Sequence, residues 1–200
     1  QPARLVSSLR VRIIAVRLKL IEAACEKQET ANIILPLIGC YRAIHTTGIS
    51  PEFINNYPTP DDSSKELIAT QFTEPKQEEE IRNSLQELRG ITDTTSRRVQ
   101  DMYEENPYPR FKYSDHTASE FATPVYRSIK AETTKNNLRF SEELKSLTAK
   151  PKVLIAGCGT GNQVINASRY KNAEITAIDL SSSSLSYAIR KTKEYEMDNV

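Results

Sequence analysis

The sequence predicts an α/β protein in which a helical amino-terminal region precedes the start of a doubly wound parallel sheet. Upstream of residue 150, apolar residues recur at helical spacing between proline-rich stretches. Residues 152–156 then form a short apolar run of the kind found in parallel strands that are buried on both faces. We therefore expect an α-helical region at residues 1–95, a helical connector at 96–150 and a partial sheet domain at 151–200.

The composition is that of a water-soluble protein with a modest core. Of the 200 residues, 38% are apolar and 26% are charged, and the net charge of +1 gives no strong signal for nucleic-acid binding. The apolar run at residues 33–39 is shorter than the roughly 20 residues that a membrane span needs. The three cysteines are single and widely spaced, which favours a reducing, cytoplasmic location.

Two helices are expected first, packed against each other as a hairpin. Residues 3–29 are amphipathic, and their apolar face consists of Leu5, Leu9, Ile13, Val16 and Leu20. We expect this face to be turned towards the core and the basic face towards solvent. A second helix is expected at about residues 31–45, ended by Gly48. Because Pro36 is tolerated only in a first turn, this helix is expected to start nearer Leu35.

Residues 50–73 are polar and rich in proline, which predicts a loop with a short helix at about residues 64–71. Thr73 is expected to cap the next helix, and Gly90 to end it. The apolar face of that helix is expected to be Ile81, Leu85 and Leu88.

A further helix is predicted at residues 94–105 and ends before Pro107, because the residue before a proline is disfavoured in a helix. Its inward-facing residues are expected to be Val99, Met102 and Tyr103. Between this helix and the first strand, short helices are expected at residues 124–133 and 141–147.

Three glycines follow the first predicted strand at alternate positions, Gly157, Gly159 and Gly161, and a helix is expected from Asn162. Alternating glycines let the backbone turn sharply from a strand into a helix. They also leave room for a ligand to approach the main chain, close to the free N–H groups of the helix start. This pattern predicts a nucleotide-binding loop.

The second strand is predicted at residues 174–178, and Asp179 stands at its carboxyl end. In parallel sheets, ligands bind across the carboxyl ends of the strands, where an acid can accept hydrogen bonds from both ribose hydroxyls. Ser181 is expected to cap a final helix. The apolar face of this helix is expected to be Leu185, Ala188, Ile189 and Thr192.

Four short motifs resemble those of a known enzyme class. Residues 157–161 (Gly-Cys-Gly-Thr-Gly) resemble motif I of class I S-adenosylmethionine-dependent methyltransferases, and residues 177–181 (Ala-Ile-Asp-Leu-Ser) resemble the motif that follows. Residues 103–110 (Tyr-Glu-Glu-Asn-Pro-Tyr-Pro-Arg) and 167–170 (Ala-Ser-Arg-Tyr) are similar to a bacterial methyltransferase family often found downstream of tetratricopeptide repeats. The resemblance covers roughly residues 75–200.

This resemblance implies a Rossmann-like domain that binds S-adenosyl-L-methionine. The loop residues implied to line the cofactor are Gly157, Cys158, Gly159, Thr160 and Gly161. Asp179 would hold the ribose hydroxyls, and Leu180 would pack on the adenine. Ile155 departs from the family pattern, which has Asp or Glu there to position the amino end of the cofactor. Another group must then do so, or the affinity for the cofactor is lower.

Cys158 is interpreted as a packing residue whose backbone matters, because no neighbouring cation or base that could activate its thiol is evident. Tyr103, Tyr108 and Arg110 are candidate lid residues over the cofactor or acceptor, since this proline-stiffened segment precedes the first strand. The alternative is that the Pro-Tyr-Pro turn simply packs the helical region onto the sheet.

Three functions follow from these residues. The first is a methyltransferase whose acceptor, a small molecule or a protein, these residues do not specify. Its acceptor-binding and catalytic residues would lie after the fourth strand, so no catalytic residue is assigned, and no metal site is expected. The second is an NAD-dependent oxidoreductase or epimerase, which Asn162 disfavours because the dinucleotide fingerprint has a small residue there. The third is a non-catalytic protein-interaction module with a degenerate cofactor domain.

The chain starts at Gln1 instead of a methionine and stops at Val200 within a pattern, so we expect it to be part of a longer protein. Two strands do not complete a doubly wound sheet. We therefore expect an exposed apolar strand edge, low stability and no catalytic activity for these 200 residues alone.

Overall fold

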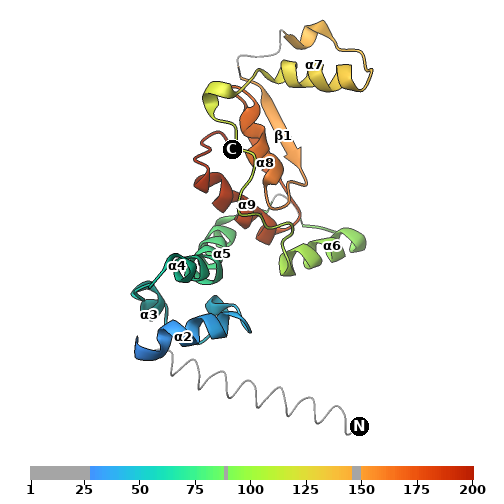
Figure 1. Ribbon diagram of the computed structural model, residues 1–200. Helices are drawn as coiled ribbons and strands as arrows, with labels where there is room; N and C mark the ends of the chain where they lie inside the picture. The colour runs from blue at the N-terminus through green and yellow to red at the C-terminus, as the bar shows by residue number, and fades with distance from the viewer. Residues whose placement is uncertain (1–27, 88–89, 146–149) are drawn as a thin grey trace. The chain divides into compact units, whose positions relative to one another are not determined.

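The computed structural model describes residues 28–87, 90–145 and 150–200 (Figure 1), and the chain divides into two compact units at residues 1–77 and 78–200. Within the described residues the protein is mainly helical, with one two-stranded parallel sheet. The predicted α/β class is confirmed at this level. The helix predicted at residues 3–29 lies almost wholly outside the described residues.

Short helices around an apolar core make up the described part of the first unit. Its helical elements are α2 (Gln28–Gly39), the 3-10 turn η1 (Ile44–Thr46), α3 (Pro51–Asn55), α4 (Asp62–Ile68), the π-helical segment η2 (Ala69–Thr73) and the first residues of α5 (Glu74–Ser84). The buried residues of the core are Ala31, Leu35, Ile38, Ile44, Ile49, Ile54, Tyr57 and Phe72. Helices this short are marginal alone in water, so apolar burial is what stabilises them.

The position of Pro36 shows why the second predicted helix was wrong. Helix α2 ends at Gly39, whereas the prediction extended the helix well past this point and put Pro36 in its first turn. Pro36 lies in the last turn instead, where its missing N–H removes one helical hydrogen bond. The helix tolerates this because Leu35 and Ile38 are buried, and because Cys40 N–H still donates to the Pro36 carbonyl (3.1 Å).

Residues 50–73, predicted to be mostly loop, are largely helical. Ser50 caps α3 by accepting a backbone N–H, and Pro51 occupies the first turn of that helix. Asp61 caps α4 in the same way. The prediction failed because it treated these prolines and acids as loop residues, whereas a cap followed by proline or acid also starts a helix.

The helix start predicted at Thr73 was also wrong, because α4, η2 and α5 follow one another directly and the backbone at Glu74 is helical. Helix α5 ends at Ser84, before the predicted stop at Gly90. Of its predicted apolar face, Ile81 and Leu85 are half-buried and Leu88 lies outside the described residues.

The second unit adds more helices before its sheet. They are the end of α5, α6 (Thr94–Glu105), η3 (Ser119–Phe121), α7 (Val125–Lys135) and η4 (Glu142–Lys145). Helix α6 has the predicted bounds and is capped by Asp93. Its predicted inward face was wrong at two positions, because Val99 is 39% exposed and Met102 54% exposed. The residues of α6 that bond to its neighbour are polar and are described below.

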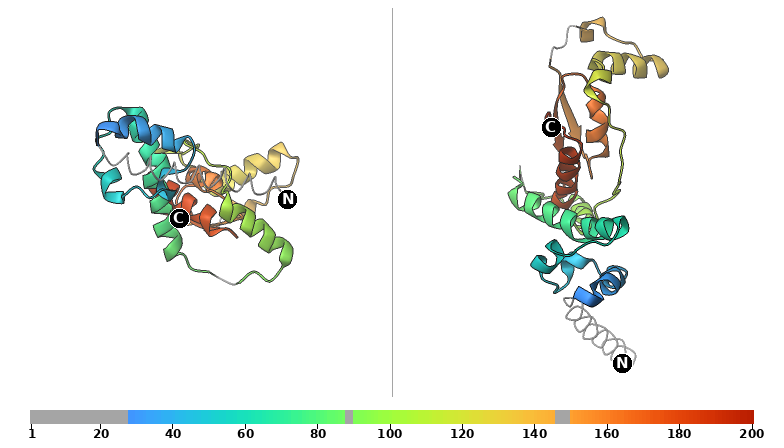
Figure 2. Two further views of the ribbon diagram at one scale, coloured as in Figure 1. Left: turned by 90° about the horizontal axis from the view of Figure 1, so that it is seen from below. Right: turned by 60° about the vertical axis from the view of Figure 1, so that its left-hand side comes forward.

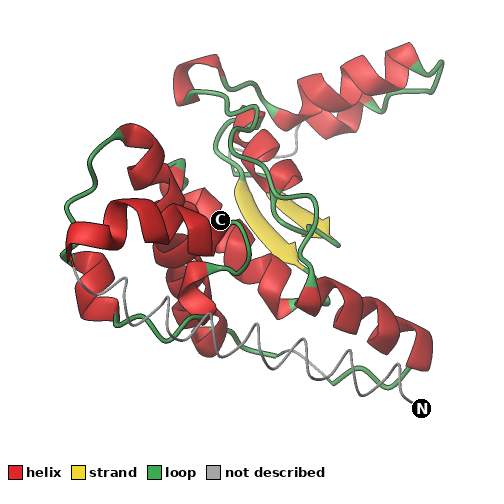
Figure 3. Ribbon diagram, turned by 60° about the horizontal axis from the view of Figure 1, so that its bottom comes forward, coloured by secondary structure: helices red, strands yellow, loops and turns green. Residues whose placement is uncertain are grey.

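The sheet pairs β1 (Lys152–Ala156) with β2 (Glu174–Ile178) in parallel, as expected for the two predicted strands. Both strands are drawn in yellow in Figure 3. They are joined through α8 (Asn162–Asn166) and the 3-10 turn η5 (Ala167–Arg169). The strand β1 is not buried on both faces as predicted, because Leu154 is 64% exposed. A second strand lies on one side of β1 and covers neither of its faces.

Helix α9 (Ser182–Glu194) follows β2, and Ser181 caps it as predicted by accepting a hydrogen bond from Ser184 N–H (3.0 Å). The predicted apolar face is only one of the two sides that this helix buries. Its polar side is buried as well, and the buried residues there are Ser183, Ser186, Tyr187, Arg190 and Lys191. Residues 109–117 cover that side and run past α8 and α9 (Figure 2).

Candidate functional site

The glycine loop joins β1 to α8 by a sharp turn, as the sequence predicted. Gly157, Gly159 and Gly161 have φ of 70°, 53° and 89°, in the left-handed region that only glycine adopts freely. The N–H groups of Gly157 and Cys158 both donate to the Ile178 carbonyl (2.8 and 3.1 Å). The loop is therefore attached to the carboxyl end of the neighbouring parallel strand.

The three glycines have different structural roles. A Cβ atom at Gly161 would lie 2.7 Å from the Cβ of Ala188, so this glycine allows α8 to pack closely on α9. A Cβ atom at Gly157 or Gly159 would meet no atom within 4 Å. Two of the glycines therefore leave open space beside the main chain, which is the room that an approaching ligand requires.

Asp179 lies at the glycine loop although it is far away in the sequence. One of its carboxylate oxygens accepts a hydrogen bond from Gly159 N–H (2.8 Å), and the other accepts from Ser181 N–H (2.9 Å). The parallel pairing of β1 and β2 explains this, because it brings the carboxyl ends of both strands to the same edge of the sheet. The structure thus bonds a half-buried carboxylate to the backbone of the glycine loop.

Cys158 and Thr160, the two side chains inside the loop, point into the protein. Cys158 belongs to a buried apolar cluster with Val164 and Ile175, and burial together with the charge of Asp179 raises the pKa of its thiol to about 11. Such a thiol is protonated at neutral pH, which agrees with its interpretation as a packing residue. Thr160 is buried too, and its hydroxyl donates to the Pro109 carbonyl.

Leu180 and Ile155 complete the predicted set. The side chain of Leu180 is 46% exposed, directly after Asp179, and its carbonyl accepts a hydrogen bond from the Gln100 side chain of α6 (2.9 Å). Ile155 is half-buried and packs against the apolar cluster under the sheet. Ile155 thus has a packing role at the position where the family pattern has an acid.

The three candidate lid residues lie in different environments. Tyr103 is half-buried in α6, whereas the side chain of Tyr108 is 73% exposed. The guanidinium of Arg110 forms an ion pair with Glu78 (2.9 Å) and lies 5.0 Å from the centre of the Tyr187 ring. Arg110 is therefore anchored, and Tyr108 is the most exposed of the three.

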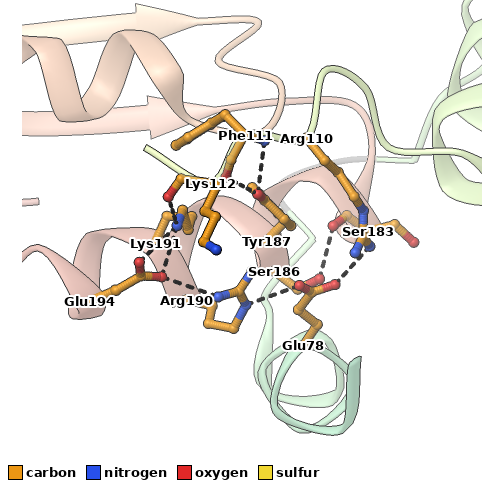
Figure 4. A network of polar contacts seen from close by, with 10 residues as sticks. All are labelled: Glu78, Arg110, Phe111, Lys112, Ser183, Ser186, Tyr187, Arg190, Lys191 and Glu194. Atoms are coloured by element: carbon orange, nitrogen blue, oxygen red, sulfur yellow. Dashed lines mark hydrogen bonds and ion pairs between the residues drawn. The ribbon is translucent and has the colours of Figure 1, made fainter. Parts of the chain in front are cut away.

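Arg110 belongs to a segment that α9 holds by its side chains, as Figure 4 shows. The hydroxyl of Tyr187 accepts from the N–H of Phe111 (3.0 Å) and donates to its carbonyl (2.6 Å). Lys191 Nζ donates to the Lys112 carbonyl (2.9 Å). These bonds satisfy backbone groups of residues 109–114 that have no strand partner. With the bond from Thr160, they attach this segment to both α9 and the glycine loop.

A buried ion pair lies under the same segment. The carboxylate of Glu78, from α5, contacts Arg190 Nε (3.0 Å) with one oxygen and Arg110 with the other. The side chains of Glu78 and Arg190 are 5% and 8% exposed, so the pair is almost fully removed from water. These contacts were not predicted. The spacing of apolar residues contains no information on which charged groups meet across 112 positions of sequence.

Glu104 is the second residue that the sequence did not identify. Its carboxylate accepts hydrogen bonds from the N–H of Ser182, from the N–H of Ser183 (3.1 Å) and from both serine hydroxyls (3.1 and 2.7 Å). Burial raises the pKa of Glu104, but these hydrogen bonds outweigh it and the net pKa lies below the ordinary value. The serine run from Ser181 to Ser184 was the one available signal, since it is dense in donors at a helix start.

The described residues contain no group of three or more His, Cys, Asp or Glu side chains arranged to hold a metal ion. In the same part of the chain, no helix has the length and apolar character needed to cross a membrane. No protein-family model matches the chain, and neither a curated protein nor a solved structure matches it significantly. The function must therefore be inferred from the geometry of the site.

Proposed function

We propose that the protein binds S-adenosyl-L-methionine at the glycine loop and Asp179, in a Rossmann-like domain, and is a class I methyltransferase. One observation carries the proposal. Gly157 and Gly159 leave open space where a side chain would lie, and Gly159 N–H donates to the carboxylate of Asp179, at the carboxyl ends of two parallel strands. This is where parallel α/β sheets bind nucleotides.

The chemistry of the residues present suits this cofactor. Each carboxylate oxygen of Asp179 accepts one backbone N–H, and each has a further lone pair for a ribose hydroxyl. Gly157 and Gly159 allow the cofactor to approach the main chain. The half-exposed side chain of Leu180 offers an apolar surface to an adenine ring.

S-adenosyl-L-methionine supplies a methyl group already activated on a sulfonium. The chain then has to bind the cofactor, align it with an acceptor and exclude water. The glycine loop and Asp179 do the first of these. A general base is required only where the acceptor carries a proton on its reactive atom. We assign neither an acceptor nor such a base among these residues.

Calorimetric titration of the 200-residue protein with S-adenosylhomocysteine and with NAD tests the proposal. We expect S-adenosylhomocysteine to bind and NAD to bind more weakly or not at all. Binding of NAD alone would identify a dinucleotide site instead. Binding of neither would favour a protein-interaction module.

Replacing Asp179 with Asn sharpens the test. We expect Asp179→Asn to weaken S-adenosylhomocysteine binding about tenfold to hundredfold, because hydrogen bonds to a charged group contribute about 1.5–3 kcal/mol. Asp198→Asn is the matched control, since Asp198 is an exposed acid beyond α9. Equal affinities of the two variants would contradict the role of Asp179.

A further inference from the structure

The turn between β2 and α9 is held by a helix from outside the sheet. Gln100 and Glu104 lie one turn apart on α6, the first bonding to the carbonyl of Leu180 and the second to the start of α9. Helix α6 thus contacts the residues directly after Asp179, which form the nucleoside end of the proposed site. In Figure 1, α6 and α9 lie side by side at this end.

The N–H groups of residues 181–184 all have acceptors. Ser181 N–H donates to Asp179, Ser184 N–H donates to the Ser181 hydroxyl, and the N–H groups of Ser182 and Ser183 donate to Glu104. A helix start normally offers such N–H groups to phosphate or another anion. Here a carboxylate from α6 accepts two of them, so a bound phosphate would meet the negative charges of Glu104 and Asp179, and the N–H groups of residues 181–184 are already bonded.

We infer that Glu104 is a positioning and specificity residue of the proposed nucleotide site, which it restricts to a nucleoside without a phosphate on the ribose. The inference rests on the proposed function. By neutralising the start of α9, Glu104 holds Leu180 and Ser181 in place and leaves the Asp179 carboxylate directed at the glycine loop. Glu104 itself does not touch the cofactor in this scheme, because all four of its hydrogen bonds are made to Ser182 and Ser183.

Two ligands test this assignment by calorimetry: S-adenosylhomocysteine, and adenosine 2′-monophosphate as the phosphorylated probe. We expect the unaltered protein to bind the first and to reject the second. Glu104→Ala removes the carboxylate and frees the N–H groups of Ser182 and Ser183. We expect this variant to lose about tenfold in S-adenosylhomocysteine affinity and to gain affinity for adenosine 2′-monophosphate, since backbone donors at a helix start attract phosphate.

Glu105→Ala is the matched control, because Glu105 is the exposed neighbour of Glu104 on the same helix. We expect it to behave like the unaltered protein with both ligands. A purely structural role of Glu104 predicts instead that S-adenosylhomocysteine affinity falls together with the melting temperature, while adenosine 2′-monophosphate is still not bound.

The outcomes separate this inference from the proposed function. If the unaltered protein does not bind S-adenosylhomocysteine, the proposed function and the inference both fail. If it binds S-adenosylhomocysteine but the two glutamate variants have equal affinities for both probes, only the inference fails. A loss of S-adenosylhomocysteine affinity and of melting temperature in Glu104→Ala, with no gain in adenosine 2′-monophosphate binding, would likewise overturn the inference alone.

Discussion

The two compact units are stabilised in different ways. The described part of the first unit has a core made almost entirely of aliphatic and aromatic residues from short helices. The second unit buries polar groups around α9, including an ion pair, a lysine and a run of serines. An apolar core tolerates changes in its exact contacts, whereas a buried polar group must keep its partner. The second unit therefore depends on specific long-range pairs, and four variants test this difference.

The largest effect is expected from Glu78→Ala in the second unit. This change leaves Arg190 buried without its main partner, and breaking a buried pair costs about 3–5 kcal/mol in free energy of unfolding. Glu79→Ala, at the exposed neighbouring acid, is the control and should change little. Hydrogen exchange followed by mass spectrometry should show faster exchange in peptides of α9, with peptides of α2 unchanged. Equal exchange rates in the two variants would show that the ion pair of Glu78 and Arg190 does not stabilise this unit.

A slightly smaller effect is expected from Leu35→Ala in the first unit. Leu35 is fully buried, and truncating such a leucine costs about 3 kcal/mol through lost burial and the cavity left behind. Leu37→Ala, on the exposed side of the same helix, serves as the comparison. Exchange should rise in peptides of α2 and α3 while α9 keeps its protection. Faster exchange in α9 as well would contradict a local effect of Leu35.

The smallest effect is expected from alanine in the glycine loop. Gly161→Ala places a Cβ against Ala188 and strains a left-handed backbone, which should lower the free energy of unfolding by about 2 kcal/mol. Gly159→Ala meets no atom, so it should cost only about 1 kcal/mol from backbone strain. We expect Gly159→Ala instead to weaken S-adenosylhomocysteine binding more than Gly161→Ala does. The reverse order in melting temperature would show that the two glycines have been assigned the wrong roles.

The parts of the fold that were predicted well depend on local rules. The two strands, the sharp turn at the three glycines, the start of α8 and the Ser181 cap all follow from residues within a few positions of one another. The first unit was predicted less well. Pro36 and the prolines of residues 50–73 were interpreted as helix boundaries, whereas buried neighbours and capping residues decided where those helices lie.

The candidate site also has a part that was predicted from local sequence and a part that was not. The glycine loop and Asp179 were identified from their spacing, because a strand, a glycine-rich turn and an acid at the next strand end form a pattern that is visible in one dimension. Glu104, Gln100 and Tyr187 were not identified. Each acts through a partner more than 70 positions away in the chain, and their own neighbours in the sequence show nothing of that partner.

The sequence by itself determined the α/β class, the glycine loop that joins β1 to α8, and the acid beside that loop. Each of these depends on backbone conformation set by nearby residues. Tertiary structure alone decided which glycine packs and which stays open, how α6 neutralises the start of α9, and how Glu78 joins Arg190 to Arg110. The physical reason is that a buried polar group bonds to a group close to it in space, which can lie far away in the sequence. The spacing of apolar residues and the residue types in turns reflect only residues that are close together in the sequence.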